Sequence, residues 1–400
     1  MKLVTRALII FCIAAEIGLG QVRAPAPDDN IEGVQAAALD QPRIYLNLRR
    51  DAKGPVLRTN DQEHLSGIEA FLDTGASGVM LSSDTVKKLG IQSAQNVTFE
   101  DVGIGGSEKF GVTEPLMLAA GEYPRSDPET ADYSAATGPI RMQIKSGGGL
   151  IDLIAPGMDV AGMPLMVGRV VVLDPRPLAQ FDKISTKLLE PGDKAIPKTT
   201  RHVPLTIVSF ARFTRVKPAG SAGPELVGNP MIGPNPFDAK GGGRPVTIRH
   251  RGKTVTGTFL LDTGAAASVI STALAAKLGV TTAADGTLAG IPKDQQFQLA
   301  IGGLGGAKQP AGTFFDRLEL PTTEGRPIVY ARAPLLITDI TVADESGKPF
   351  TIDGVIGMNY LVASAEVTGG LLPDIGKIVD GPYSSIVIDF NRNLLGLEPK

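Results

Sequence analysis

One stretch of this 400-residue chain occurs twice, and this duplication constrains the fold more than any other feature of the sequence. Residues 71–91 (FLDTGASGVMLSSDTVKKLGI) and residues 260–280 (LLDTGAAASVISTALAAKLGV) align without a gap at an offset of 189. Nine of the 21 positions are identical, namely Leu72/Leu261, Asp73/Asp262, Thr74/Thr263, Gly75/Gly264, Ala76/Ala265, Ser82/Ser271, Lys88/Lys277, Leu89/Leu278 and Gly90/Gly279. Such a repeat predicts two copies of one lobe in a single chain. If the copies face each other, they bring Asp73 and Asp262 together.

Each copy has the same predicted local structure of a strand, a tight loop that carries the aspartate, a second strand and a short helix. The strands that enter the loops are predicted at 68–72 and 257–261. Ser82 or Ser83 in the first copy and Ser271 in the second are suited to cap the helix N-terminus. Gly90 and Gly279 stand where a glycine ends a helix.

The repeat continues beyond these blocks. Residues 160–166 (VAGMPLM) resemble residues 355–361 (VIGMNYL), with Gly162 in register with Gly357. Residues 170–178 (VVVLDPRPL) resemble residues 386–394 (IVIDFNRNL), so three matched blocks follow in the same order. We therefore predict an N-terminal lobe at 43–190 and a C-terminal lobe at 246–400. The Pro- and Gly-rich segment 191–245 is predicted to connect them and to contain one strand at 203–213.

Composition favours a mainly β protein. The chain has 48 glycines and 30 prolines, and long helical periodicities are scarce, which is typical of many short strands joined by turns. Hydrophobic residues make up 42%, enough for a core in each lobe, and the net charge is only −3. The sequence has neither a basic stripe, as nucleic-acid binding would require, nor an acidic tail.

The N-terminus has the pattern of an export signal. Lys2 and Arg6 precede an apolar run at 7–19, and small residues near Gly20 suit cleavage, so we predict a signal peptide at 1–20. The only cysteine, Cys12, lies inside it, so the mature chain has neither a disulfide nor a thiolate metal site. We expect an exported bacterial protein, periplasmic or secreted, with no membrane span after cleavage. Residues 21–42 are predicted to form a flexible leader.

The duplicated loops resemble those of the aspartic peptidases, with two lobes in one chain as in pepsins and a loop sequence like that of retropepsins. The resemblance covers roughly residues 42–400 through its spaced blocks. It implies two closed β-barrel lobes with the active site between them, a monomer that needs no cofactor or metal, and a peptide or protein substrate. Asp73 and Asp262 would be catalytic. Loop support would come from Thr74, Gly75, Ala76, Thr263, Gly264 and Ala265, and the segments behind the loops would contain Gly162 and Gly357.

The residue types explain this chemistry on their own. Two carboxyl groups held close together do not both ionise easily, so they share one proton. One then acts as a base on a bound water while the other donates a proton to the scissile carbonyl. Glycine after Asp-Thr allows a tight turn with N–H groups aimed at the carboxylates. The threonine hydroxyl can bond to the opposite loop, and the apolar residue before each aspartate anchors the loop in its core.

Two glycine-rich stretches, 102–111 and 301–312, follow the aspartates, and the second resembles the flap tip of retroviral proteases. The possible flap residues are Gly105, Gly106, Gly302, Gly303, Gly305 and Gly306. An ordinary β-hairpin turn explains either stretch equally well. The chain has no tryptophan, and neither stretch contains the tyrosine of a pepsin flap. Pepsins also have Ser or Thr where this chain has Ala76 and Ala265, so both features point to the retropepsin side.

Two other interpretations stay open. The chain could be a catalytically silent binding or inhibitor protein with a pepsin fold, although such proteins tend to lose one aspartate. It could also be a β-rich envelope protein with coincidental Asp loops. The scattered histidines His64, His202 and His250 show no metal-ligand spacing, and no G-x-S-x-G motif occurs.

Overall fold

The computed structural model describes residues 30–59, 67–145, 159–180, 182–210, 213–216, 227–238, 243–303, 305–344, 346, 348–368 and 374–400. Strands dominate these residues, and the α-helices in them are short: α1 (Ser83–Lys88), α3 (Met163–Met166) and α4 (Thr272–Lys277). The prediction of a mainly β protein with a few short helices is confirmed. Within the described ranges, no helix is long and apolar enough to cross a membrane. The predicted signal peptide at 1–20 lies outside the described residues.

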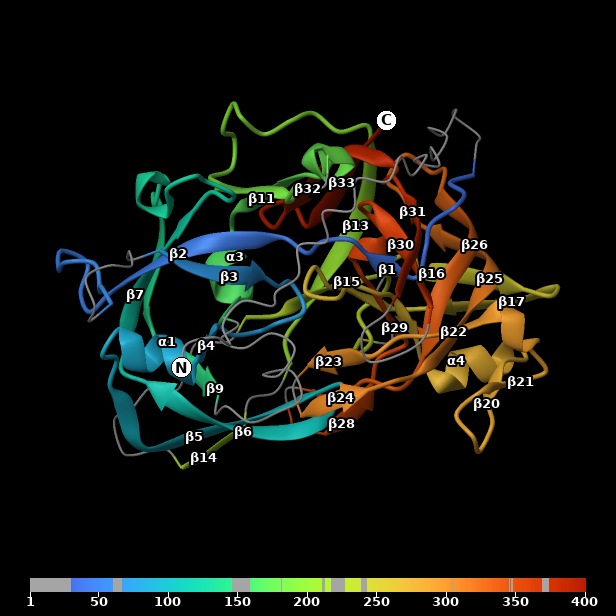
Figure 1. Ribbon diagram of the computed structural model, residues 1–400, viewed down its shortest axis with the longest axis horizontal. Coiled ribbons are helices and arrows are strands. Elements are labelled where there is room, and N and C mark those ends of the chain that lie inside the picture. Colours follow the sequence, from blue (N-terminus) through green and yellow to red (C-terminus); the bar gives the residue numbers. More distant parts are fainter. Residues whose placement is uncertain are drawn as a thin grey trace, which may run out of the picture.

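The first copy of the repeat builds most of a ten-stranded sheet, which lies on the blue and cyan side of the molecule (Figure 1). In spatial order its strands are β14 (Phe213–Val216), β5 (Ser93–Gly103), β6 (Gly106–Thr113), β9 (Gln143–Lys145), β4 (Met80–Ser82), β10 (Asp159–Ala161), β3 (Ile68–Leu72), β2 (Arg43–Arg49), β7 (Leu116–Gly121) and β8 (Ala135–Ile140).

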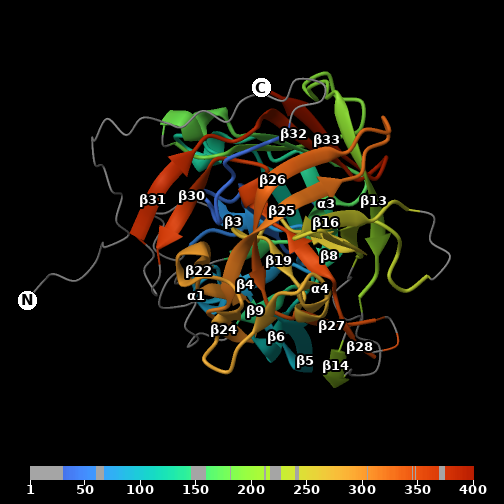
Figure 2. The same cartoon turned by 90° about the vertical axis from the view of Figure 1, so that its right-hand side faces the viewer.

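The second copy belongs to a fourteen-stranded sheet that includes the orange strands β25 and β26 at the right of Figure 1. The order along its main path is β12 (Ser185–Leu189), β11 (Val170–Asp174), β32 (Tyr383–Asp389), β33 (Leu394–Pro399), β13 (Arg201–Val208), β15 (Asn229–Ile232), β18 (Phe259–Leu261), β29 (Gly354–Ile356), β19 (Val269–Ile270), β26 (Ile328–Ile337), β25 (Ala311–Leu320), β16 (Val246–His250) and β17 (Lys253–Gly257), with β22 (Gln296–Gln298) beside β25. Figure 2 views the molecule from this side, with β25 and β26 in front.

Closed β-barrels are not found among the described strands, so that part of the fold prediction is corrected. The first sheet ends at β14 and β8, which do not pair with each other, and the second ends at β12 and β17. The reason lies in the strands that extend each sheet. The connector supplies β14 to one edge of the first sheet, and the second sheet continues through β13, β33, β32 and β11 to β12 instead of returning to β17.

The two copies are related by matched strand pairings. In the first copy β3 pairs in parallel with β10, and in the second β18 pairs in parallel with β29. The third pair of repeated blocks forms β11 and β32, which pair antiparallel with each other, with Val172 opposite Val387. Strand β11 therefore crosses from the predicted N-terminal lobe into the sheet of the second copy. Pairing between equivalent segments is consistent with an approximate two-fold relation between the copies.

The local signals read from the repeat are confirmed. The Ser82 side chain accepts a hydrogen bond from the Thr85 N–H at 3.1 Å, and Ser271 accepts one from the Leu274 N–H at 3.3 Å. These bonds cap α1 and α4, as the serine positions predicted. Past the helix C-termini, Gly90 has a φ of 62° and Gly279 a φ of 88°, left-handed values that favour glycine.

Residues 30–42 pack against the fold, which corrects the flexible leader predicted for residues 21–42. Ile31 and Val34 are buried, and the short strand β1 (Ala37–Ala38) pairs with β30 (Ser364–Thr368) next to β31 (Asp374–Val379). In Figure 1 this part of the chain lies beside the red strands before it continues into β2. The apolar side chains that the segment buries explain why it is ordered. Residues 21–29 lie outside the described residues.

The connector also has more structure than the single strand predicted. β13 covers most of the predicted strand at 203–213, and β14 and β15 follow it within 191–245. β14 joins the first sheet beside β5, and β15 joins the second beside β18. The connector thus contributes strands to both sheets. Three further hairpins complete the described strands: β20 (Thr281–Thr282) with β21 (Leu288–Ala289), β23 (Ile301–Gly303) with β24 (Gly306–Lys308), and β27 (Thr341–Ala343) with β28 (Pro349–Thr351).

Candidate active site

The two Asp-Thr-Gly-Ala loops begin where β3 and β18 end. Leu72 and Leu261, the last residues of these strands, are fully buried and belong to one hydrophobic core cluster. The Asp73 N–H donates to the Ala161 carbonyl at 3.0 Å, and the Asp262 N–H donates to the Ile356 carbonyl, also at 3.0 Å. Each aspartate is therefore held between a buried strand and the parallel strand behind it.

The two loops are interlocked through their threonines. The Thr74 hydroxyl donates to the Leu261 carbonyl at 2.6 Å and accepts from the Thr263 N–H at 3.0 Å. The Thr263 hydroxyl mirrors this arrangement: it donates to the Leu72 carbonyl at 2.6 Å and accepts from the Thr74 N–H at 3.0 Å. Both threonines are buried. The cross-loop bond expected of the threonine hydroxyl is present in both directions.

This interlock brings the carboxyl groups of Asp73 and Asp262 into hydrogen-bond contact with each other. Gly75 and Gly264 make the approach possible. A Cβ atom on Gly75 would lie 2.6 Å from Cγ of Asp262, and one on Gly264 would collide with the Asp73 carboxyl group. The two aspartates, 189 residues apart in the sequence, thus meet across the two loops.

The pKa of each carboxyl group is raised, chiefly because burial disfavours the charged form. The pKa of Asp262 is raised further, because the negative charge of Asp73 opposes its ionisation and because it donates a hydrogen bond to Asp73. The same bond has the opposite effect on Asp73, where it offsets part of the rise in pKa that burial causes. Loop N–H groups of Gly75 and Ala76 stabilise the Asp73 carboxylate, and the Gly75 bond is 2.7 Å long. The pair as a whole therefore keeps a proton to higher pH than an isolated aspartate does.

One carboxyl oxygen of the pair is left without a hydrogen bond by these contacts. Asp262 Oδ1 is buried and has no hydrogen-bond partner among the described residues. A buried polar atom of this kind calls for a hydrogen-bond partner beyond the described residues, such as a water molecule or a bound ligand. The alanines that follow the loop glycines bring no hydroxyl group to this place. The Ala76 and Ala265 carbonyls accept bonds from the N–H groups of Met163 and Met358, each at 2.8 Å.

Gly162 and Gly357 lie directly behind the loops, as their positions in the repeat predicted. A Cβ atom on Gly357 would come within 2.7 Å of the Ala267 carbonyl oxygen and 2.8 Å of the Ala265 carbonyl oxygen. A Cβ atom on Gly162 would overlap the carbonyl oxygens of Gly78 and Ala76. Since the obstacle in each case is backbone, only glycine fits.

We expect Gly162→Ala and Gly357→Ala each to lower the free energy of unfolding by about 2–4 kcal/mol, because the added methyl group displaces the loop behind the aspartate. Chemical denaturation measures the change. Gly111→Ala serves as the control, since its Cβ would meet only the Ile144 side chain, at 3.5 Å. Equal losses in Gly111→Ala and the two site variants would contradict the close-approach argument.

Both glycine-rich stretches form β-hairpin turns, and the tips of the two hairpins touch. The first turn joins β5 to β6 and the second joins β23 to β24, side by side at the lower edge of Figure 1. A Cβ on Gly105 would collide with the backbone of Gly305 and Gly306, and the Gly305 N–H donates to the Glu108 carboxylate at 3.0 Å. Gly106 lies in the same tip, while Gly302 and Gly303 belong to β23.

Two residues next to the loops were not anticipated. The Gln41 side-chain amide donates to the Gly264 carbonyl, and the Asn229 side-chain amide donates to the Gly75 carbonyl. The sequence does contain a signal for them: residues 41–44 read Gln-Pro-Arg-Ile and residues 229–232 read Asn-Pro-Met-Ile, at an offset of 188. That block is too short to stand out beside the longer repeats.

The comparisons with known proteins bear on this geometry. Residues 245–360 match the family model described as aspartyl protease. The matched range contains the Asp262 loop, the hairpin β23–β24 and Gly357. No curated protein matches the chain. The match supports a relation to aspartyl proteases through the second copy, and the internal repeat extends the same pattern to the first.

Within the described part of the chain, no group of three or more His, Cys, Asp or Glu side chains is placed to hold a metal ion. His202 contacts Glu324 at 2.7 Å, and His250 is buried beside Phe315 and 3.3 Å from Asp316. His64 lies outside the described residues. The polar groups at the interlocked loops include the two carboxyl groups and backbone N–H donors.

Proposed function

We propose that this protein is an aspartic endopeptidase in which Asp73 and Asp262 activate a water molecule against a peptide bond. The observation that carries the proposal is the hydrogen bond between the two carboxyl groups across loops interlocked by Thr74 and Thr263. A pair of carboxyl groups that shares one proton provides both the base and the acid that peptide hydrolysis needs.

In the proposed reaction, the ionised Asp73 removes a proton from the water while the protonated Asp262 donates its proton to the scissile carbonyl oxygen. The water oxygen bonds to the carbonyl carbon and forms a tetrahedral diol. Collapse of the diol breaks the C–N bond, with a proton passing from Asp73 to the leaving nitrogen and a hydroxyl proton returning to Asp262. Asp262 Oδ1, which has no hydrogen-bond partner among the described residues, offers a contact for the substrate or the water.

We propose that the hairpins β5–β6 and β23–β24 act as two flaps that open to admit a peptide and close by tip contact. The glycine tips and the bond from the Gly305 N–H to Glu108 support this role. Flaps that exclude water would strengthen the electrostatic effect of the carboxyl pair. The substrate would be an extended segment of a peptide or protein that lies between the two halves.

We also propose an oligomeric state, an architecture and a location for this protein. Both half-sites lie on one chain, which supports a working monomer with a bilobal, pepsin-like architecture. The N-terminal pattern of basic, apolar and small residues supports export to the periplasm or the medium, followed by signal cleavage.

Endopeptidase activity can be tested with internally quenched peptides whose two termini are blocked, because exopeptidases cannot attack them. We expect cleavage at internal bonds, mapped by mass spectrometry, and inhibition by pepstatin-type compounds. A preparation that leaves every such peptide intact over the full pH range, with the fold verified by circular dichroism, would contradict the proposal.

We expect a pH optimum in the weakly acidic to near-neutral range. A hydroxyl that donates to a carboxylate stabilises its charged form and lowers its pKa. With alanine at positions 76 and 265, both loops lack that donor, and burial raises the pKa of both aspartates. The pair should therefore keep its shared proton to higher pH than a pair with the hydroxyl donors.

The measurement is the pH dependence of kcat/KM on a fluorogenic peptide, compared between the native chain and the variants Ala76→Ser and Ala265→Thr. The variants should shift the profile to lower pH. A shift to higher pH, or a strongly acidic optimum in the native chain, would refute the role given to the missing hydroxyls.

A further inference from the structure

Gln41 and Asn229 occupy equivalent positions in the two copies. On β2, Arg43 pairs with Phe71, and on β15, Met231 pairs with Leu260. Phe71 and Leu260 each stand two residues before their aspartate, so the two pairings match. Gln41 lies two residues before Arg43, and Asn229 lies two residues before Met231. The two side-chain amides are thus related by the same internal symmetry as the aspartates.

Each amide reaches across to the loop of the other copy. Gln41, which leads into the first copy, donates to the Gly264 carbonyl of the second loop. Asn229, which belongs to the second sheet, donates to the Gly75 carbonyl of the first loop. Asn229 is only 3% exposed, and its Oδ1 has no hydrogen-bond partner among the described residues. Burying an amide with one unpartnered atom costs free energy of folding. A role of the amide beside the loop would explain why this cost is tolerated.

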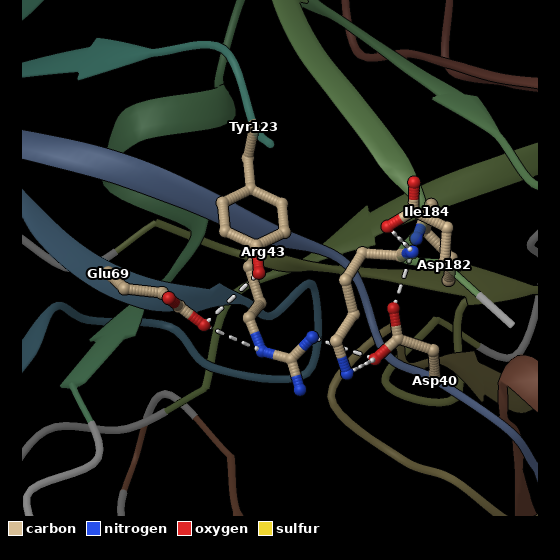
Figure 3. A network of polar contacts seen from close by, with 7 residues as sticks. Asp40, Arg43, Glu69, Tyr123, Asp182 and Ile184 are labelled. Atoms are coloured by element: carbon tan, nitrogen blue, oxygen red, sulfur yellow. Dashed lines mark hydrogen bonds and ion pairs between the residues drawn. The ribbon is translucent and has the colours of Figure 1, made fainter. Parts of the chain in front are cut away.

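The segment that carries Gln41 is firmly held on both sides. Before it, the Ala38 N–H donates to the Ala266 carbonyl at 2.8 Å, next to the Asp262 loop. Around it, Asp40 pairs with Arg43 at 2.7 Å and accepts from the Ile184 N–H at 3.0 Å. Figure 3 shows Arg43 bridging Asp40 and Glu69, with Tyr123 also on Glu69. This network fixes the backbone from which the amide reaches the opposite loop.

The accepting carbonyls belong to the peptide groups that serve the carboxyl pair. The Gly264 carbonyl and the Ala265 N–H are parts of one peptide group. That N–H donates to the Asp262 backbone carbonyl at 3.3 Å and also acts to lower the pKa of the Asp262 carboxyl group. The Gly75 carbonyl shares a peptide group with the Ala76 N–H. That N–H donates to the Asp73 backbone carbonyl at 3.3 Å and also acts to lower the pKa of the Asp73 carboxyl group. Hydrogen bonds in a chain polarise one another, so donation to the carbonyl strengthens the N–H as a donor. The amide also limits rotation of the peptide group.

We propose that Gln41 and Asn229 are positioning residues that orient and polarise the peptide groups facing Asp262 and Asp73, each acting on the aspartate of the opposite copy. The inference rests on the proposed peptidase function only for its kinetic consequences. The charged groups on the Gln41 segment, Asp40 and Arg43, are paired with each other, and Lys183 lies 3.8 Å from Asp40. Replacing the Gln41 amide leaves these pairs in place, so any change in the carboxyl titration can be assigned to the lost donor.

The test uses Gln41→Met and Asn229→Leu, which keep a similar side-chain shape and remove the donor. We expect kcat to fall about tenfold and KM to change by less than about twofold, because the loop N–H groups matter most when charge develops. We also expect the titration of the carboxyl pair, followed by 13C NMR of labelled aspartate, to move to higher pH. Asn47→Leu is the control, since Asn47 is a buried amide on β2, the strand that follows Gln41, and no hydrogen bond among the described residues joins its side chain to either loop.

Gln41→Glu separates positioning from simple space filling. A protonated glutamic acid can still donate to the Gly264 carbonyl, whereas the ionised form only accepts. Its activity relative to the native protein should therefore be close to one at acid pH and fall as the pH rises. Gln41→Met should show no such recovery at acid pH. Equal defects in both variants at every pH, or an unchanged carboxyl titration in folded Gln41→Met and Asn229→Leu, would overturn the inference.

The two proposals fail in different ways. If the native protein cleaves no peptide, the proposed function is wrong, while the NMR titration still decides the role of Gln41 and Asn229. If the native protein is active and the substitutions move neither kcat nor the titration, only the positioning role is wrong. Should Gln41→Met or Asn229→Leu fail to fold, Gln41→Glu and Asn229→Asp measured across the pH range give the same decision.

Discussion

Asp73→Asn and Asp262→Asn should each abolish peptide cleavage, with kcat/KM lower by at least about a thousandfold and the fold intact. An amide can neither take a proton from water nor return one, and the two carboxyl groups act as a unit with one shared proton. Because each asparagine keeps the size of the aspartate, the interlocked loops should remain in place. Steady-state kinetics on a quenched peptide measures the loss, and circular dichroism verifies the fold.

Asp159→Asn is the matched control. Asp159 is another buried carboxyl group, 2% exposed, and its pKa is raised to about 6 chiefly by burial. It accepts hydrogen bonds from the Thr85 hydroxyl at 2.6 Å and the Ser82 N–H at 2.7 Å, so its role is to hold the start of α1. Its replacement should reduce stability and leave peptidase activity within about tenfold of native. Full peptidase activity in Asp73→Asn or Asp262→Asn would assign the catalysis to other residues.

The same two loop variants should change how stability depends on pH. The folded-state pKa of both carboxyl groups lies above the unfolded value of 3.8, so the folded protein holds the shared proton more tightly than the unfolded chain. The native protein therefore loses stability as the pH rises from about 4 through the folded-state pKa. Asparagine does not ionise, so the variants should lose less stability over this window in pH-dependent denaturation. An unchanged slope would mean that the pair is not desolvated in solution.

Thr74→Val and Thr263→Val should each lower the free energy of unfolding by about 3–5 kcal/mol. Valine has nearly the shape of threonine, yet it removes one donated and one accepted bond and leaves a buried carbonyl and a buried N–H unpaired. The remaining folded protein should also lose at least about a hundredfold in kcat, because the carboxyl groups are no longer held in contact.

Thr74→Ser and Thr263→Ser test the same interlock from the other side. Serine keeps the hydroxyl and loses only a buried methyl group, which costs about 1 kcal/mol. We therefore expect serine to retain most of the stability and activity that valine loses, as measured by denaturation and kinetics. If serine and valine behave alike, the threonines contribute through packing and not through the cross-loop bonds.

The sequence by itself determined the parts of the site that depend on local pattern and on repetition. The strands before Asp73 and Asp262, the serine caps of α1 and α4, and the glycines that end these helices follow from short-range preferences of single residue types. The internal repeat allowed further predictions about how the two loops are arranged. Because the same loop and the same backing glycine occur twice in the same order, a contact between the loops and a close approach by Gly162 and Gly357 were predictable.

Only the tertiary structure decided the features that depend on pairing between distant segments. The packing of residues 30–42, the strand pairing of β11 with β32, the connector strands β14 and β15 and the open edges of both sheets could not be read from the chain. Gln41 and Asn229 are the clearest case. A glutamine or asparagine before a proline is a common turn pattern, and nothing local indicates which carbonyl its amide will meet. That partner lies 223 residues away for Gln41 and 154 for Asn229. Such contacts arise only when both copies have folded and faced each other, because the geometry that joins the two loops is a property of their packing and not of either loop alone.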